Sequence, residues 1–154
     1  MIRTLLIGAV LTALTGMAMA ADPVLGTWQL NLVKSKFSPG PAPKSMTRTY
    51  EESAQGTVTL TINTTSAEGK TGSVTYTYKN DGKPYPVSAN ADADMASVTT
   101  VTASKASFKQ IRAGATIATG VRTVSNDGKT LTVAQKGTHA SGAPFNDVIV
   151  YDRQ

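Results

Sequence analysis

Apolar and polar side chains alternate residue by residue through much of the chain. Val58, Leu60 and Ile62 alternate with threonines, and the same period of two recurs within 71–79 and 129–136. Successive side chains of a β-strand point to opposite faces, so this period is typical of strands with one buried face. Outside the N-terminal segment, no run of ten residues has the spacing of an amphipathic helix.

Turn-forming residues separate the alternating runs. The tetrapeptide Asn-Asp-Gly-Lys occurs at 80–83 and again at 126–129, and Asp-Gly supplies the positive φ that tight hairpins require. Abundant Thr and Val also fit a pleated surface better than a helix. We therefore predict eight to ten strands, within the ranges 26–33, 45–53, 56–64, 71–79, 84–88, 96–103, 105–112, 115–125, 129–136 and 144–152.

Strands joined mostly by short turns favour an antiparallel meander. A sheet of this size must split into a sandwich or curl and close, and closure removes exposed strand edges. We predict an all-β fold, an antiparallel up-and-down β-barrel of 8–10 strands, in a single domain spanning 21–154. The connection at 36–44 differs from the short turns, because Pro39, Pro41 and Pro43 exclude both a helix and a paired strand there. We expect a stiff extended loop over one end of the barrel.

The first 20 residues have the three-part layout of a secretory signal peptide. Arg3 provides a positive charge, 5–14 is an uncharged apolar run, and 18–20 provides small residues before a cleavage site. The apolar run is shorter than the roughly 20 residues that a membrane-spanning helix needs. We expect a signal helix, cleavage between Ala20 and Ala21, and a periplasmic or secreted protein with no membrane span in its mature form.

Composition excludes several kinds of site. The chain has no cysteine and one histidine, which rules out disulfides, a thiol nucleophile and a zinc site built from Cys and His. The formal net charge of +5 is spread along the chain, with no dense basic run and no interleaved aromatic side chains. We therefore expect no nucleic-acid partner, no metal and no cofactor.

Candidate catalytic groups are few. His139 lies in a Gly-, Ala- and Ser-containing stretch typical of an exposed turn, and the chain has no Gly-x-Ser-x-Gly elbow. The segment 90–94 is similar to the first half of a calcium loop, but Met95 and Val101 stand where such a loop requires Gly and Glu. Because no nucleophile, metal cluster or acid–base pair is visible, we predict that the protein is not an enzyme.

The two ends of the barrel sequence carry a family resemblance. Gly26-Thr27-Trp28 opens the first strand and Tyr151-Asp152-Arg153 closes the last. A Gly-x-Trp in the first strand, with a basic residue near the C-terminus, resembles the calycin superfamily of lipocalins, fatty-acid-binding proteins and avidins. The resemblance implies a lipocalin-like barrel whose closed end is formed by Gly26 and Trp28, with Arg153 stacked on the indole. The opening strand also resembles a branch of small secreted bacterial proteins.

The chain departs from these families at positions that carry their functions. A proline-rich loop stands where fatty-acid-binding proteins have a helical lid. Tyr151 fits their Arg-x-Tyr signature on the last strand, but Ile149 stands where that signature has arginine. Avidins place several tryptophans around biotin, and this chain has one tryptophan. The resemblance therefore supports the fold without supporting a specific fatty-acid or biotin function.

Some side chains are expected to face the barrel interior and form a ligand site. Tyr76 and Tyr78 share a face with Val74, and abundant small residues leave space for a cavity. A barrel of this size either fills with side chains or holds one small ligand, and the sequence leaves both open. An inward arginine is costly unless it is paired, so inward Arg112 or Arg122 would indicate an acidic ligand group. The candidate ligand-binding residues are Tyr76, Tyr78, Phe108, Arg112, Arg122 and Tyr151.

The sequence favours an exported, non-catalytic, lipocalin-like protein that binds a small hydrophobic or amphipathic molecule inside its barrel. The alternative is a protein-interaction module, such as a barrel-type inhibitor of a secreted hydrolase, whose contact surface is the Pro-rich loop 36–44. In that case we expect a barrel interior filled by side chains.

Overall fold

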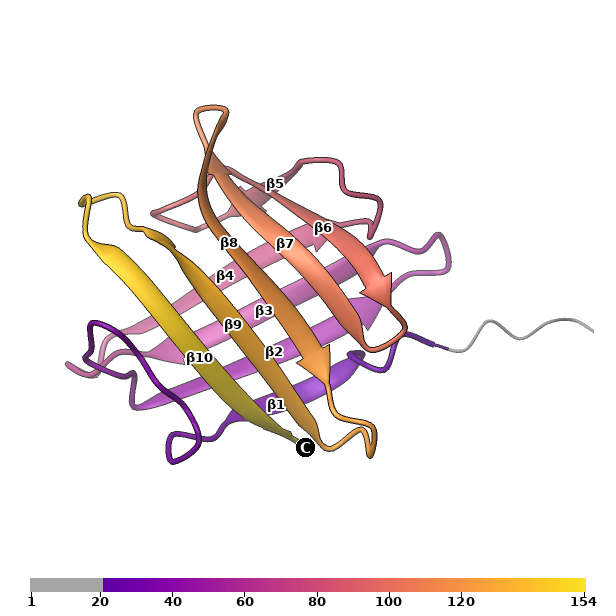
Figure 1. The fold of residues 1–154 in the computed structure, drawn as a ribbon, viewed down its shortest axis with the longest axis horizontal. Coiled ribbons are helices and arrows are strands. Elements are labelled where there is room, and N and C mark those ends of the chain that lie inside the picture. The colour runs from indigo at the N-terminus through magenta and orange to yellow at the C-terminus, as the bar shows by residue number, and fades with distance from the viewer. Residues whose placement is uncertain (1–20) are drawn as a thin grey trace, which may run out of the picture.

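The computed structural model describes residues 21–154, and ten antiparallel strands close into a barrel (Figure 1). Each strand pairs with the next one along the chain, and β10 pairs with β1. This confirms the predicted all-β, up-and-down barrel. The expected signal helix lies outside the described residues. The strands are β1 (Gly26–Leu30), β2 (Ser45–Glu52), β3 (Val58–Thr65), β4 (Thr71–Tyr78), β5 (Tyr85–Ser88), β6 (Met95–Thr102), β7 (Lys105–Arg112), β8 (Ala115–Val124), β9 (Thr130–Thr138) and β10 (Pro144–Arg153).

The first strand is shorter than predicted. It ends at Leu30 rather than at residue 33, because Asn31 turns the chain and its side-chain carbonyl accepts a hydrogen bond from the Lys34 backbone N–H. Leu32 and Val33 are therefore exposed, Val33 to 97%. The other strands begin and end within two residues of the prediction.

The proline-rich connection between β1 and β2 is anchored on the edge of β10 before it crosses to β2. Lys36 pairs with Val148, and the Ser38 carbonyl accepts a hydrogen bond from the Asn146 backbone N–H. The prediction of an unpaired segment therefore holds only from residue 39 onward, where the proline rings remove the backbone donors that pairing would require.

One end of the barrel is closed by the two terminal strands. Trp28 is fully buried and its Nε1 donates to the Val24 carbonyl at 2.7 Å. The guanidinium carbon of Arg153 lies 4.1 Å from the indole centroid. Gly26 has a φ of 114°, and a Cβ there would lie 3.0 Å from Arg153 Nη1, so this position requires glycine. The Arg153 guanidinium also donates to the carbonyls of Pro23, Leu25 and Gly128.

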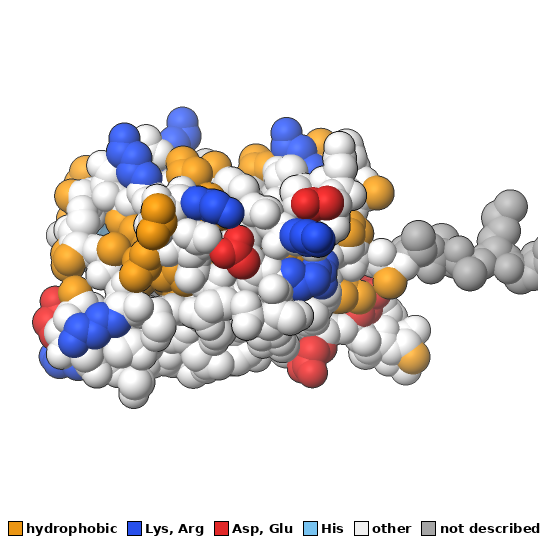
Figure 2. All heavy atoms as spheres, turned by 90° about the horizontal axis from the view of Figure 1, so that it is seen from below, with side chains coloured by type: hydrophobic (Ala, Val, Ile, Leu, Met, Phe, Trp, Pro, Cys, Tyr) orange, Lys and Arg blue, Asp and Glu red, His pale blue; other side chains and the backbone are white. Residues whose placement is uncertain are grey.

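The outer face of the barrel in Figure 2 is mostly uncharged. Lys and Arg side chains lie singly or in small groups on this face, and Asp and Glu side chains are interspersed among them. Within residues 21–154, no helix is both long enough and apolar enough to cross a lipid bilayer.

Candidate functional site

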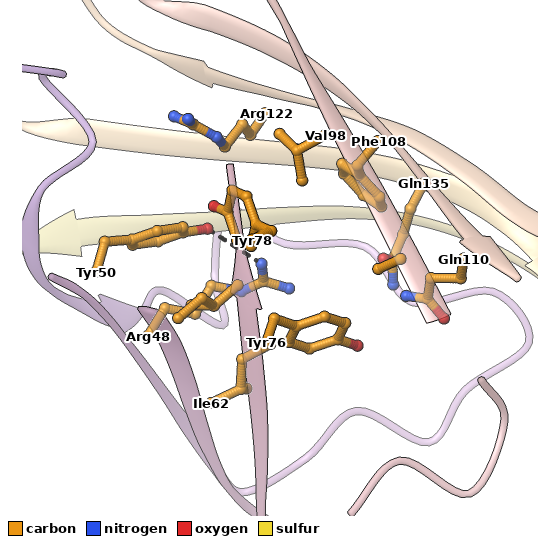
Figure 3. A pocket seen from close by; sticks show the side chains of 12 residues that line it. Arg48, Tyr50, Ile62, Tyr76, Tyr78, Val98, Phe108, Gln110, Arg122 and Gln135 are labelled. Carbon is orange, nitrogen blue, oxygen red and sulfur yellow. Dashed lines mark hydrogen bonds between the residues drawn. The ribbon is translucent and has the colours of Figure 1, made fainter. Parts of the chain in front are cut away.

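An internal cavity of about 50 Å³ lies among inward-facing side chains of seven strands (Figure 3). The lining comes from alternate positions of each strand, because every second side chain of a strand faces the interior. The volume exceeds the roughly 10–15 Å³ that one ordered water requires. The lining residues are Arg48, Tyr50, Leu60, Ile62, Tyr76, Tyr78, Ala96, Val98, Phe108, Gln110, Arg122 and Gln135.

Aromatic side chains form much of the cavity wall. Tyr76 and Tyr78 lie on the same face of β4, and Phe108 faces them from β7 (Figure 3). The Tyr76 hydroxyl accepts a hydrogen bond from Asn90 Nδ2 at 2.8 Å. Burial raises the pKa of both tyrosines above the usual value. Both hydroxyls are therefore neutral at physiological pH and act as dipolar partners.

Arg48 on β2 is a buried cation that faces the cavity, with 8% of its surface exposed. Its Nε donates to the Tyr151 hydroxyl at 2.9 Å and its Nη1 donates to the Tyr50 hydroxyl at 3.3 Å. Among residues 21–154, no carboxylate lies within ion-pair distance of this guanidinium. Burial alone would lower the pKa of Arg48, but Tyr151 and Tyr50 outweigh that effect and raise it. The site therefore holds a positive charge whose protein partners are neutral.

Arg122 on β8 is also buried and inward, but a carboxylate of the protein compensates its charge. Its Nη2 lies 2.8 Å from Asp22 Oδ2, and its Nη1 donates to Asp22 Oδ1 at 3.5 Å. Burial alone would lower the pKa of Arg122, whereas the hydrogen bond with Asp22 raises it and dominates. Arg122 and Arg48 therefore both face the barrel interior, but only the charge of Arg122 is balanced by a carboxylate of the protein.

The structure separates the remaining two predicted site residues from the cavity wall. Tyr151 is fully buried behind Arg48 and orients it through the hydroxyl. Arg112 does not line the cavity, and its Nη1 donates to the Asp92 carbonyl at 3.2 Å. Arg112 is the last residue of β7, and its side chain extends to the loop 89–94 beyond the strand end rather than into the cavity.

Two glutamines lie at the opposite end of the cavity from Arg48. Gln110 of β7 and Gln135 of β9 point toward one another in Figure 3. Gln135 Nε2 donates to Asp147 Oδ2 at 3.3 Å. A side-chain amide has two donors and two acceptor lone pairs, so this end of the cavity retains hydrogen-bonding capacity for a ligand.

The loop 89–94 joins β5 to β6 at the end of the barrel opposite Trp28. Asp92 Oδ2 of this loop lies 2.8 Å from His139 Nδ1 in the β9–β10 loop. Asn90, which is also in the loop 89–94, donates a hydrogen bond to Tyr76 of the cavity wall. Burial alone would raise the pKa of Asp92, but its hydrogen bonds, first of all that with His139, hold the pKa below the usual range. His139 is in an exposed turn, as predicted, and also fastens two loops together.

Sequence reasoning did not identify Arg48, Tyr50, Gln135 or Asp22 as site residues. The pattern around Arg48 contained a signal, since Thr47 and Thr49 alternate with Arg48 and Tyr50 and place the latter two on one face. The pairing of Asp22 with Arg122 leaves no such local signal, because the two residues are 100 positions apart.

Comparison with known proteins identifies solved structures that have a similar fold. No family model and no curated protein matches the chain. The fluorescent protein UnaG has 16% sequence identity and a TM-score of 0.57, with coverage of 86% of this chain and 98% of UnaG. As-p18, an extracellular fatty acid binding protein, has 12% identity and a TM-score of 0.57, with coverage of 86% and 97%. Zebrafish ileal bile acid-binding protein in complex with cholic acid has 10% identity and a TM-score of 0.50, with coverage of 86% and 99%. The chain therefore has the fold of the fatty-acid-binding-protein-like calycin barrels.

Proposed function

We propose that this protein is an exported, non-catalytic barrel that binds a small amphipathic molecule, and that Arg48 holds the acidic group of this molecule. The observation that carries the proposal is the buried Arg48 guanidinium, which faces the cavity and has only hydroxyl partners. Burial of a charge without an opposite charge costs several kcal/mol. An anionic ligand offsets that cost and gains charge-assisted hydrogen bonds.

The structural neighbours support a ligand of this class. One is described as a fatty acid binding protein and another was solved with cholic acid, and both ligands are amphipathic acids. The alternative function, an interaction module that uses the loop 36–44, predicted an interior filled by side chains. A cavity with a cation facing it favours ligand binding over that alternative.

The proposal of export rests on the sequence of the first 20 residues, with a basic start, an apolar run and a small-residue cleavage motif. Expression of the full chain in a Gram-negative host, followed by mass spectrometry of the periplasmic fraction, tests it. We expect a mature protein that begins at Ala21. An uncleaved chain retained in the cytoplasm would contradict export without affecting the binding proposal.

The binding test uses the protein of residues 21–154 and measures the dissociation constants of octanoate and 1-octanol by displacement of a fluorescent lipid probe. We expect tighter binding of the acid, and we expect Arg48→Met to weaken acid binding by about 10- to 100-fold because a charge-assisted hydrogen bond is lost. The matched control is Lys109→Met, which removes the same charge from an exposed position on β7. Equal acid binding by Arg48→Met and the unsubstituted protein would contradict the proposal.

A further inference from the structure

We infer that the ligand of this cavity is a compact ring-containing acid with a second hydrogen-bonding group opposite its carboxylate, rather than a long-chain fatty acid. The inference rests on the proposed function, because it concerns the same cavity and assigns Arg48 the same role. It adds the size of the ligand, the shape of its centre and the chemistry of its far end.

The size follows from the space inside the barrel. The cavity measures about 50 Å³, whereas pockets for drug-sized ligands enclose about 300–1,000 Å³. The rings of Tyr76, Tyr78 and Phe108 line this space (Figure 3). A long acyl chain does not fit in this volume unless these rings move, and a single-ring acid is the more compact ligand.

The position of Phe108 is built into the sheet. Phe108 pairs with Gly120 of the neighbouring strand β8, and both positions face the interior. A Cβ at Gly120 would clash with the Phe108 ring and with the Ala134 carbonyl. The ring therefore lies directly on the backbone of β8, in a space that only glycine leaves open. This contact holds one aromatic wall of the cavity in place.

The shape of the ligand's centre follows from the side walls. Tyr76 and Phe108 present ring surfaces to the cavity, and Leu60, Ile62 and Val98 complete an apolar belt around it. Aromatic pairs prefer offset or edge-to-face contacts and gain affinity beyond simple burial. A planar ring uses these walls better than a flexible chain, which also loses more conformational entropy when it is ordered.

The chemistry of the ligand's far end follows from the two glutamines. Arg48 with its tyrosine hydroxyls forms one polar end of the cavity, and the amides of Gln110 and Gln135 form the other (Figure 3). An apolar tail would displace water from these amides without replacing its hydrogen bonds, which carries a desolvation penalty. A hydroxyl or similar group satisfies them, and such sites discriminate strongly against analogues that lack this group.

The experiment compares 4-hydroxybenzoate, benzoate and octanoate by isothermal titration calorimetry on the protein of residues 21–154. We expect 4-hydroxybenzoate to bind about three- to tenfold more tightly than benzoate, the difference that one net hydrogen bond provides. We expect octanoate to bind more weakly than 4-hydroxybenzoate. The ranking of the three acids tests the inference on the unsubstituted protein, so it does not depend on any variant that fails to fold.

Substitutions assign the effect to the glutamines. Gln110→Leu and Gln135→Leu should each reduce the preference for 4-hydroxybenzoate over benzoate while leaving benzoate affinity within about twofold, because only the hydroxyl contact is lost. The control is Gln29→Leu, which removes an amide that donates to the Met46 carbonyl outside the cavity lining. This variant should retain the preference.

The outcomes separate the inference from the proposed function. Tighter binding of octanoate than of 4-hydroxybenzoate, with Arg48 still required, overturns the inference and leaves the proposed function standing. A preference for 4-hydroxybenzoate that persists in both leucine variants also overturns the role of the glutamines. Acids that bind equally well to Arg48→Met, or that do not bind at all, overturn both.

Discussion

The replacement of Asp22 by asparagine should destabilise the barrel through a buried charge that loses its partner. The Asp22 carboxylate is the counter-ion of Arg122, whose side chain is 5% exposed, and their nearest atoms are 2.8 Å apart. Asparagine preserves the shape of the side chain but removes its charge. The Nε of Arg122 already lacks a hydrogen-bond partner among the described residues, so the guanidinium has little alternative compensation.

The size of the effect follows from the burial of the pair. Removal of one partner from a buried ion pair typically costs about 3–5 kcal/mol. Asp22 retains 19% exposure and asparagine still offers one acceptor oxygen, so we expect a loss of about 2–4 kcal/mol in the free energy of unfolding. At roughly 3–4 °C per kcal/mol for a domain of this size, the melting temperature should fall by about 6–16 °C.

Urea denaturation of the protein of residues 21–154, followed by circular dichroism, measures this loss. The double variant Asp22→Asn with Arg122→Met should be more stable than Asp22→Asn alone, because it removes the unpaired charge. Asp152→Asn is the control, since Asp152 pairs with Lys34 on the surface at 3.6 Å and should contribute less than about 1 kcal/mol. A loss below about 0.5 kcal/mol for Asp22→Asn, or no recovery in the double variant, would refute the reasoning.

Three further predictions concern the closed end, the loop 89–94 and the cavity wall. Arg153→Met removes three carbonyl contacts and the stacking on Trp28, and should lower the free energy of unfolding by about 2–4 kcal/mol in urea titrations. The pKa of Asp92 is lower in the folded state than its unfolded value of about 3.9, so its contribution to stability is present above about pH 4 and is lost as the pH falls. Asp92→Asn should therefore show a flatter decline in urea midpoint between about pH 5 and pH 2, and an unchanged decline would contradict this. Gly120→Ala should displace the Phe108 ring and weaken binding of any cavity ligand in the calorimetric titration, and unchanged binding would show that the ring is not seated on this glycine.

The strands and the barrel could be read from the sequence because the relevant information is local. A period of two defines a strand and its faces within eight residues, and the two Asp-Gly turns separate β4 from β5 and β8 from β9. The inward positions of Tyr76 and Tyr78 follow directly from that period. The early end of β1 was missed because Asn31 stops the strand through a side-chain hydrogen bond while the apolar pattern continues into Leu32 and Val33.

The candidate site was less predictable because its charges depend on contacts that are distant in sequence. Arg48 and Arg122 both occupy inward positions, but only the folded barrel brings Asp22 to one of them and not to the other. Arg112 is the last residue of β7, and its guanidinium donates to the Asp92 carbonyl instead of facing the cavity. This contact joins residues 20 positions apart and leaves no pattern within one strand.

The pairing of β1 with β10 imposes an order on assembly. Trp28 is opposite Arg153, so the ring of strands becomes continuous only after the last strand has been synthesised. Until then, β1 and β9 present unpaired edges, which are prone to associate with other chains. Nascent chains that lack β10 should therefore depend on chaperones, and burial of the indole should report the final step of folding rather than the initial collapse.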